Sequence, residues 1–390
     1  MAEKRIVYFV GGRLSKALER PGKRIPLMYD FVSVMAEYAD RDTILLTTLA
    51  RLEDANVFEH ECSECVKLAH EVLTENVPSE TKRAFKKAFM GRQPESIEQL
   101  LENAHTRGRP AEGPSAIELV IRFNYAINRY FSILAWGVNW DPLEKFLQHQ
   151  LKRHPPESSQ HTFVSFNYDL ILDRTVQLAG ADDWNPFTGY GFFIRWYVEP
   201  GGKEAKPFPA NFEPPPSDRI RILKPHGSLN WLVPQEDRGG TDPTGYRLKD
   251  GPVAIPLGER GELRYSDWIE PTAAYRLGSL AVCIIPPTDP AKRVNLGFIE
   301  NTRCLERLAI ESADEVYVLG WSIPVTDKDQ DRLIRSSVGE RRRPPDLVTV
   351  INRCETPDYF DRVAATFGVT RSALQVFNNG FSDFVEHSTS

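Results

Sequence analysis

Residues 6–12 read Ile-Val-Tyr-Phe-Val-Gly-Gly, and this stretch decides the fold that we expect. Five consecutive apolar, β-branched or aromatic residues suit a central strand of a parallel sheet, because helices cover both faces of such a strand. A turn that contains glycine after such a strand is the place where α/β folds hold a phosphate group. The sequence therefore predicts a buried parallel strand with a ligand site at its end.

Strands and helices alternate in the rest of the chain. Strands are predicted at 162–166, 220–224, 282–285, 315–319 and 347–352. Helices are predicted at 170–178, 298–312 and 327–338. This alternation is typical of βαβ units, so we expect an α/β fold in which helices flank a parallel sheet.

A long helical block separates the first two predicted strands. Its helix starts are indicated by the capping-box spacing of Ser115 and Glu118, and by Asp141 followed by Pro142. The block is too long for a connection within one βα unit. We therefore expect one domain built from 1–35 and 160–390, with a helical insertion at 36–159. Loop-rich excursions are expected at 182–220 and 235–271, where glycine, proline and charge accumulate.

Composition limits the possible partners and location. The chain has 390 residues, of which 41% are hydrophobic and 26% charged, and its formal net charge is -6. An acidic balance gives no general attraction to nucleic acid or to anionic lipid. No apolar run approaches the roughly 20 residues that span a bilayer, and the N-terminus lacks a signal-peptide pattern. We expect a cytoplasmic protein that binds neither membrane nor nucleic acid directly.

The five cysteines do not indicate a metal site. Cys62 and Cys65 form a single Cys-x-x-Cys, whereas a structural zinc site usually needs two such pairs. An odd count in a chain expected to be cytoplasmic also argues against a framework of disulfides. We therefore expect no metal.

Small or polar residues follow each strand predicted for the sheet, where a nucleotide would lie in such a fold. Asn167 and Asp169 follow the second strand, and His226 follows the third. The complete candidate set is Gly11, Gly12, Ser15, Asn167, Asp169, His226, Gly320, Ser322 and Asn352.

These segments, taken in order, resemble the sirtuins, and more closely the sirtuin-like domains of prokaryotic anti-phage defence proteins. The resemblance rests on IVYFVGGRLS at 6–15, Pro26 after Gly22, VSFNYD at 164–169, LKPHGSLNW at 223–231, VLGWSIPVTD at 318–327 and TVIN at 349–352. It covers about a third of the chain. It implies a Rossmann-type fold that binds NAD as a substrate.

The resemblance also implies roles for the candidate residues. His226 would be the catalytic base, since a histidine exchanges protons near neutral pH. Asn167 would orient the ribose, the nicotinamide amide or a water molecule, and Asp169 would hold the nicotinamide-ribose end. The remaining roles are binding roles: Gly11, Gly12 and Ser15 would face the pyrophosphate, Gly320 and Ser322 the phosphate or ribose, and Asn352 the adenosine.

Two departures separate this chain from the family pattern. Arg13 stands where the phosphate loop usually has its third glycine, so its side chain could obstruct the pyrophosphate, point outward or pair with phosphate. The two Cys-x-x-Cys pairs of the zinc ribbon in deacetylase sirtuins are not present.

Three functions therefore remain open. The first is an NAD glycohydrolase that releases nicotinamide and ADP-ribose, acting as a regulated effector of bacterial anti-phage defence. It is expected to form a homo-oligomer and to act with an ATPase or a nucleotide-sensing partner protein. The second is a catalytically degenerate scaffold that binds NAD or ADP-ribose in a defence complex, and the third is a lysine deacylase.

Structural roles are also open for individual residues. Asn167 and Asp169 could form an Asx turn that caps the next helix, and the segment from Gly320 to Ser322 could be an ordinary turn. His226 could be a buried structural histidine. Trp231 and Trp321 are expected to pack in the core rather than to stack on a ligand.

Overall fold

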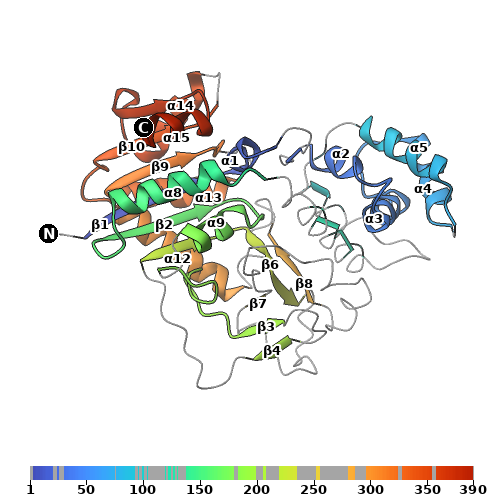
Figure 1. The fold of residues 1–390 in the computed structure, drawn as a ribbon, viewed down its shortest axis with the longest axis horizontal. Helices are drawn as coiled ribbons and strands as arrows, with labels where there is room; N and C mark the ends of the chain where they lie inside the picture. The colour runs from blue at the N-terminus through green and yellow to red at the C-terminus, as the bar shows by residue number, and fades with distance from the viewer. Residues whose placement is uncertain are drawn as a thin grey trace.

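The strand predicted from residues 6–10 is β1 (Lys4–Val10), and it lies at the centre of a six-stranded sheet in a computed structural model of the chain (Figure 1). The strand order is β11-β10-β9-β1-β2-β5, and each neighbouring pair is parallel. The other strands are β2 (Ser159–Ser165), β5 (Ile220–Leu223), β9 (Glu315–Leu319), β10 (Leu347–Ile351) and β11 (Leu374–Phe377). The predicted α/β class with a Rossmann-like parallel sheet is confirmed.

β1 is central because both of its faces are apolar. Ile6, Tyr8 and Val10 belong to one buried cluster, whereas Val7 and Phe9 belong to another. Alternate side chains of a strand point to opposite faces of a sheet, so this strand contributes to both hydrophobic layers. All five side chains are at most 1% exposed. A strand with two apolar faces has to be covered on both sides, and the flanking helices provide that cover.

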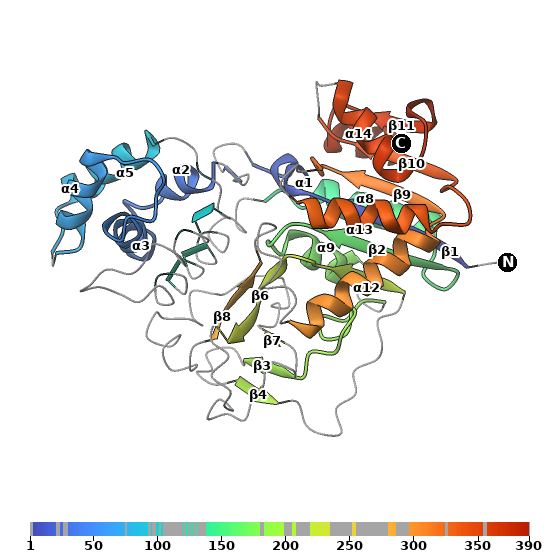
Figure 2. The same cartoon turned by 180° about the vertical axis from the view of Figure 1, so that it is seen from behind.

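The helices are divided between the two faces of the sheet, as the opposite views in Figures 1 and 2 show. One face carries α1 (Gly12–Ala17), α8 (Asp141–Arg153), α9 (Ile171–Ala179) and α15 (Phe381–Thr389). The other carries α12 (Gly297–Ser312), α13 (Lys328–Gly339) and α14 (Pro357–Phe367), and the 3-10 turn η3 (Arg371–Ala373) follows α14. The first group packs on Tyr8, whose ring meets Phe146 of α8 edge-on at 6.0 Å.

A helical lobe, of which the structure fully describes four helices, lies between β1 and β2 in the sequence, on the side of the sheet where α1 follows β1 (Figure 1). These helices are α2 (Phe31–Ala36), α3 (Thr43–Asp54), α4 (Ser63–Val72) and α5 (Ser79–Met90). α3, α4 and α5 fall within the predicted insertion 36–159, whereas α2 lies before its boundary except for Ala36. The last helix of that segment, α8, does not join the lobe: it starts at Asp141 with Pro142 in its first turn, as predicted, and packs on the sheet.

A second, mostly antiparallel sheet has the order β4-β3-β7-β6-β8. Its strands are β3 (Trp196–Val198), β4 (Ala205–Pro207), β6 (Gly227–Pro234), β7 (Val253–Ala254) and β8 (Leu280–Ile284). β8 corresponds to the strand expected at 282–285. The expectation that this strand alternates with helices in the parallel sheet was wrong, because β8 pairs antiparallel with β6.

Two strands of the structure were not predicted. The first is β6, which begins at Gly227 shortly after the third predicted strand. Residues 347–352 were expected to hold the last strand, but β11 adds an edge strand beyond β10. β11 is four residues long, Leu-Gln-Val-Phe, and unlike the other strands of this sheet it has no buried residue.

The structure describes part of the chain. The described residues are 3–20, 24–25, 30–74, 76–92, 95, 99–100, 103, 119, 122–123, 126–127, 130, 138–179, 183–198, 205–207, 219–234, 252–254, 280–285, 296–323, 327–353 and 357–389. The capping box expected at Ser115 and Glu118 lies outside these residues, as do Gly22 and Pro26. Within them, the structure contains no helix that is both long enough and apolar enough to cross a bilayer.

Candidate functional site

The candidate residues lie at the C-terminal ends of neighbouring parallel strands. From β1 the chain builds β2 and β5 on one side and then crosses to β9, β10 and β11 on the other. The strand order therefore reverses between β1 and β9, and open α/β sheets bind ligands at such a switch point. Gly11 follows β1, Gly320 follows β9 and Asn352 follows β10, so these three residues surround the switch point.

Backbone contacts join the ends of β1, β9 and β10. The amide of Gly11 donates to the carbonyl of Leu319 at 3.0 Å, and the carbonyl of Gly320 accepts from the amide of Arg13 at 3.2 Å. Gly320 has a φ of +61°, and a Cβ there would lie 2.2 Å from the amide nitrogen of Leu14. Only glycine fits both conditions. The close contact between two chain segments therefore explains why glycine is required at position 320, and no ligand is needed to explain it.

A chain of side-chain hydrogen bonds connects the ends of β1 and β2. Nδ2 of Asn167 donates to Oγ of Ser15 at 3.0 Å, and Oγ of Ser15 donates to Oδ2 of Asp169 at 2.9 Å. The other carboxylate oxygen of Asp169 accepts from the amide of Ile171 at 3.0 Å. Asp169 thus caps the start of α9, which is the Asx role left open by the sequence, and it also orients Ser15 and Asn167.

Asp169 is buried, and burial raises the pKa of its carboxyl group, while the ammonium of Lys224 acts in the opposite direction. Lys224 is fully buried beneath it, and Nζ donates to the carbonyl of Asp169 at 2.6 Å and to Oδ2 of Asp173 at 3.0 Å. Buried charges of this kind have to be paired, because an isolated one would carry a large desolvation penalty. Lys224 therefore fixes the backbone from which Asp169 projects.

The network continues from Asp173 into the second sheet. The hydroxyl of Tyr190 donates to Oδ1 of Asp173 at 2.6 Å and accepts from Nδ2 of Asn230 at 3.3 Å. Oδ1 of Asn230 in turn accepts from Oγ of Ser228 at 2.7 Å. All four side chains are buried. Lys224, Ser228 and Asn230 of the segment Lys-x-His-Gly-Ser-x-Asn-Trp at 224–231 therefore all belong to one continuous network of buried hydrogen bonds.

His226 forms a buried pair with Asp327. Its Nε2 lies 2.8 Å from Oδ2 of Asp327, and the two side chains are 6% and 4% exposed. The other ring nitrogen, Nδ1, is buried and has no hydrogen-bond partner within the described part of the chain. Since a carboxylate only accepts hydrogen bonds, Asp327 holds the proton of neutral His226 on Nε2. Nδ1 then carries a lone pair that is available to accept a proton.

Backbone contacts fix the position of His226 next to the end of β2. Its carbonyl accepts from the amide of Ile285 at 2.9 Å, and the carbonyl of Tyr168 accepts from the amide of Leu229 at 3.1 Å. Gly227 has a φ of +85°, and a Cβ there would lie 2.1 Å from the carbonyl oxygen of Cys283 in β8. The glycine that follows the histidine is therefore required by the strand that passes beside it.

Aromatic contacts place His226 beside Asn167. The His226 ring lies 5.9 Å from the ring of Phe166 and 6.4 Å from that of Tyr168, the two residues on either side of Asn167. Phe166 also stacks on Trp321 at 4.7 Å, and Trp321 stacks on Phe9 at 5.4 Å. Trp321 therefore packs in the core as expected, and so does Trp231, which is fully buried against the rings of Tyr190, Phe192 and Phe298.

Asn352 is a second buried polar side chain without a partner. It is 2% exposed, and neither Nδ2 nor Oδ1 has a hydrogen-bond partner among the residues that the structure describes. Its backbone is held, since its amide donates to the carbonyl of Phe377 at 3.1 Å. The preceding carbonyl, that of Ile351, accepts from the amide of Gly320 at 3.0 Å. A fixed amide with both polar atoms unused is suited to hydrogen-bond a ligand.

The remaining candidates are less constrained. Gly12 is the exposed first residue of α1, and Ser322 is half-buried two positions after Gly320. Arg13 is half-buried, and its Nη1 donates to the carbonyl of Arg353 at 3.0 Å, next to Asn352. Its guanidinium therefore reaches from α1 to the end of β10. In the described part of the chain, no hydrogen bond or ion pair joins any of these three residues to His226 or Asn167.

Sequence reasoning missed two residues of this arrangement. Asp327 was noted only as the end of the VLGWSIPVTD segment, and Lys224 only as part of LKPHGSLNW. A lysine at the end of an apolar strand is a usable signal, because a buried ammonium needs an acidic partner. No comparable feature of the sequence indicates that Asp327 pairs with His226, because the two residues are far apart in the chain.

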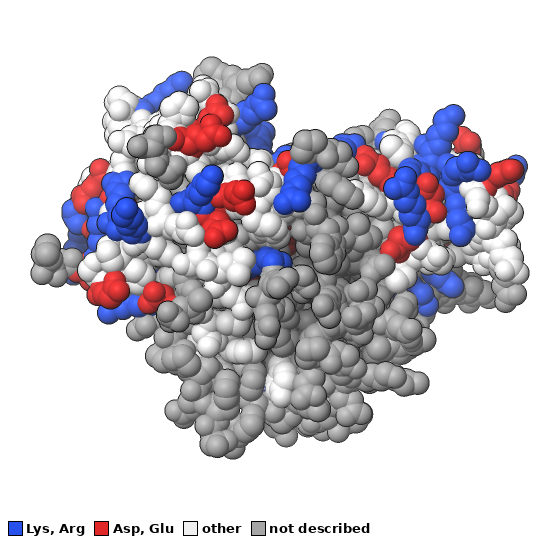
Figure 3. Space-filling model, viewed as in Figure 1, with Lys and Arg blue, Asp and Glu red and all other residues white. Residues whose placement is uncertain are grey.

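The surface and the metal-binding potential of the described residues add little to this arrangement. On the face drawn in Figure 3, acidic and basic side chains are interspersed over the described surface. No cluster of three or more His, Cys, Asp or Glu suited to a metal ion occurs in the described part of the chain.

The fold and the residues at the strand ends define a Rossmann-like α/β protein with a candidate site at its topological switch point. Searches found no match to this chain among models of protein families or among curated proteins.

Proposed function

We propose that the chain is an NAD glycohydrolase, which cleaves the bond between nicotinamide and ribose to give nicotinamide and ADP-ribose. The observation that carries the proposal is the buried pair of His226 and Asp327, which leaves Nδ1 of His226 without a partner in the described residues. The position of this pair at the ends of parallel strands, and the resemblance of the surrounding segments to sirtuin-like domains, support the same reaction.

The chemistry needs a base and a means of stabilising positive charge. Nicotinamide leaves as a neutral molecule, so the ribose passes through an oxocarbenium-like state, as in glycoside cleavage. A water molecule then adds to the anomeric carbon and loses a proton, which Nδ1 of His226 is placed to accept. The carboxylate of Asp327 would stabilise the imidazolium that results, and Asp169 would favour the charge on the ribose.

Other residues would bind the substrate. Asn167 would orient the ribose or the attacking water, because the Ser15–Asp169 hydrogen bonds already fix its amide. Asn352 would receive the adenosine side of NAD, since an amide offers both donors and an acceptor for hydroxyl groups. No metal is needed for this reaction as we propose it.

The test is release of nicotinamide from NAD, measured by chromatography over a range of protein concentrations. His226→Ala and Asn167→Ala should each lower the rate by about 10²–10⁴-fold, the usual contribution of a positioned acid–base group. His387→Ala is the matched control, because His387 is exposed on α15 and bonds to the carbonyl of Asp383. Equal release by wild type and both site variants would contradict the proposal.

A second candidate function is a scaffold that binds NAD or ADP-ribose without cleaving it. The contact of Arg13 with the carbonyl of Arg353 favours this candidate, because it places a cationic side chain across the region between α1 and Asn352. Calorimetric titration with ADP-ribose separates the two functions. Binding without nicotinamide release would support the scaffold, and in that case Arg13→Gly should restore cleavage. Of the three candidate functions, lysine deacylase has the least support, because the sequence contains no zinc-ribbon motif.

Regulation belongs to the same proposal, because a cell cannot tolerate constant loss of NAD. We propose a cytoplasmic homo-oligomer that acts as an effector of bacterial anti-phage defence and is held inactive until an ATPase or a nucleotide-sensing partner protein triggers it. Light scattering during gel filtration tests the homo-oligomer. Nicotinamide release with and without the neighbouring gene products tests the partner.

A further inference from the structure

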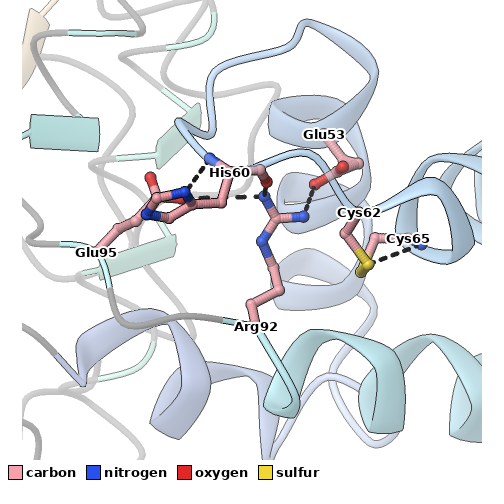
Figure 4. Close-up of a disulfide and its surroundings, with 6 residues drawn as sticks. All are labelled: Glu53, His60, Cys62, Cys65, Arg92 and Glu95. Atoms are coloured by element: carbon pink, nitrogen blue, oxygen red, sulfur yellow. Dashed lines mark hydrogen bonds and ion pairs between the residues drawn. A yellow bond between two sulfur atoms is a disulfide. The ribbon is translucent and has the colours of Figure 1, made fainter.

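Cys62 and Cys65 form a disulfide at the start of α4, in the helical lobe (Figure 4). The odd number of cysteines argued against a framework of disulfides, so this bond was not expected from the sequence. Cys62 is the N-cap residue of α4 and is half-buried, whereas Cys65 is fully buried one turn into the helix. The two sulfur atoms therefore differ in their access to solvent.

The disulfide is poorly suited to a purely structural role. It joins residues only three positions apart, and the entropy that a cross-link removes from the unfolded chain grows with the length of the loop that it closes. Packing that does not involve the cysteines also holds this part of the lobe: the Arg92 guanidinium lies 4.2 Å from the centre of the Phe58 ring, and the ring centres of Phe58 and Phe89 lie 5.4 Å apart.

Other contacts already hold the loop that carries Cys62. The carboxylate of Glu95 accepts from the amides of Glu59 and His60 at 3.1 and 3.3 Å. Arg92 donates to the carbonyl of His60 and pairs with Glu53 at 2.7 Å (Figure 4). The side chains of Arg92, Glu53 and Glu95 are each 4% exposed. Opening the disulfide would leave this clamp intact, so the two thiols would stay close enough to pair again.

The position of Cys62 also suits a reactive thiolate. The backbone amide of Cys65 donates to Sγ of Cys62 at 3.3 Å. An N–H donor and the positive end of a helix dipole stabilise a thiolate, which is the reactive form of cysteine. Exposed Glu61 and Glu64 lie on either side of Cys62 in the sequence, so their negative charges favour a reaction partner that is otherwise uncharged over one that carries further negative charge.

We propose that Cys62 and Cys65 form a reversible redox site that exchanges electrons with a dithiol. The thiolate of the dithiol attacks Sγ of Cys62, the Cys62–Cys65 bond breaks, and Cys65 leaves as a thiolate that takes up a proton. The second thiol of the reductant then attacks its own sulfur in the mixed disulfide and releases Cys62. In total, the protein disulfide gains two electrons and two protons, and the dithiol becomes a disulfide. This inference does not depend on the proposed NAD chemistry.

The first test is a thiol count on the folded full chain. Two of the five cysteines are paired, so alkylation followed by intact mass measurement should tag the other three at most. The folded chain is equilibrated with mixtures of reduced and oxidised dithiothreitol, quenched with acid and alkylated in denaturant, so that buried Cys65 is also reached. This treatment should add and remove two tags reversibly, and peptide mapping should place them on Cys62 and Cys65. Thermal unfolding should be nearly the same in both states. A disulfide that opens only in denaturant, or whose reduction unfolds the lobe, would overturn the proposal.

The second test separates the two sulfur atoms. With bis(2-hydroxyethyl) disulfide, a neutral probe, Cys65→Ser should trap about one probe molecule per chain on Cys62, whereas Cys62→Ser should trap at least tenfold less on buried Cys65. Cys304→Ser is the control, because Cys304 is an exposed free thiol on α12. Equal trapping on both cysteines would contradict the assigned roles. The wild-type titration remains decisive if a serine variant fails to fold.

Discussion

Nε2 of His226 and Oδ2 of Asp327 lie 2.8 Å apart in a buried pair at the ends of the sheet strands. The two residues come from different parts of the fold. His226 lies in the three-residue connection between β5 and β6, and Asp327 is the N-cap of α13, where its Oδ1 accepts from the amide of Gln330 at 3.3 Å. One carboxylate thus starts a helix and fixes the proton position of a histidine.

Asp327→Asn should lower nicotinamide release by about 100-fold or more while the protein stays folded. Asparagine is also a good N-cap, so α13 should keep its start, but it cannot stabilise an imidazolium as a carboxylate does. We expect kcat to fall with little change in KM, because Asp327 contacts His226 rather than the substrate. Asp331→Asn, which removes a surface pair with Arg335, is the control. A change in KM alone would show that Asp327 acts in binding.

Asn352→Leu should abolish ADP-ribose binding without destabilising the unliganded protein. Both polar atoms of the Asn352 amide are buried without partners among the described residues, and a group of that kind costs about 1–3 kcal/mol. Replacing it with an apolar side chain of similar size should raise the free energy of unfolding by about 1 kcal/mol. Urea unfolding and calorimetric titration measure the two effects. Loss of stability with unchanged binding would show that the amide serves the fold.

Gly320→Ala should destabilise the protein by about 2–4 kcal/mol, because a left-handed residue with a Cβ costs about 1–2 kcal/mol before any overlap is counted. The added carbon would lie 2.2 Å from the amide nitrogen of Leu14. Gly339→Ala provides the comparison, since nothing lies within 4 Å of a Cβ at that position. It should be neutral or stabilise by up to about 1 kcal/mol. Similar midpoints of thermal unfolding for both variants would rule out the backbone contact.

Lys224→Met should cost about 3–5 kcal/mol, because it leaves the carboxylate of Asp173 buried without its ammonium. The double variant Lys224→Met with Asp173→Leu should recover much of this loss, since it removes both buried charges. Urea unfolding of the two single variants and the double variant gives the coupling energy. If the losses of the single variants simply add, the pair does not act as a unit.

Acid should destabilise the protein through His161, whose ring is fully buried in β2. Burial lowers its pKa from 6.5 to about 4, and the neutral ring donates from Nε2 to the carbonyl of His154 and accepts from the hydroxyl of Tyr8. The unfolded chain binds this proton first as the pH falls. Stability is therefore complete above about pH 6.5 and decreases toward about pH 4, by roughly 3 kcal/mol. His161→Gln should remove that part of the pH dependence of urea unfolding, and an unchanged curve would contradict the assignment.

Much of the parallel sheet could be predicted because its strands are apolar on both faces. β1, β9 and β10 were found from such runs, and α8 from Asp141 and Pro142 at its start. β6 was missed because its first half is a polar segment, Gly227 to Asn230, whose side chains bond to one another and to the core rather than to water. The sequence shows that a residue is polar, but it does not show whether the folded protein provides a hydrogen-bond partner for that residue.

The candidate site shows the same limit. Ser15, Asn167 and Asp169 were predicted as separate strand-end residues, and the structure joins them by hydrogen bonds. Lys224, which bonds to the carbonyl of Asp169, and Asp327, which pairs with His226, were not selected, because each contact depends on which strands are neighbours in the sheet. That neighbour relation is fixed by the strand order, which alternating periodicity does not specify.

The central place of β1 has a consequence for how the protein is made. Ile6 pairs with Glu315, so the strand that closes one edge of β1 is synthesised about 300 residues later, many seconds at ordinary rates of translation. During that time a fully apolar strand has an unpaired edge, the arrangement that most readily joins another chain. We therefore expect the nascent protein to be a substrate of chaperones, which cover exposed apolar surface, until β9 leaves the ribosome.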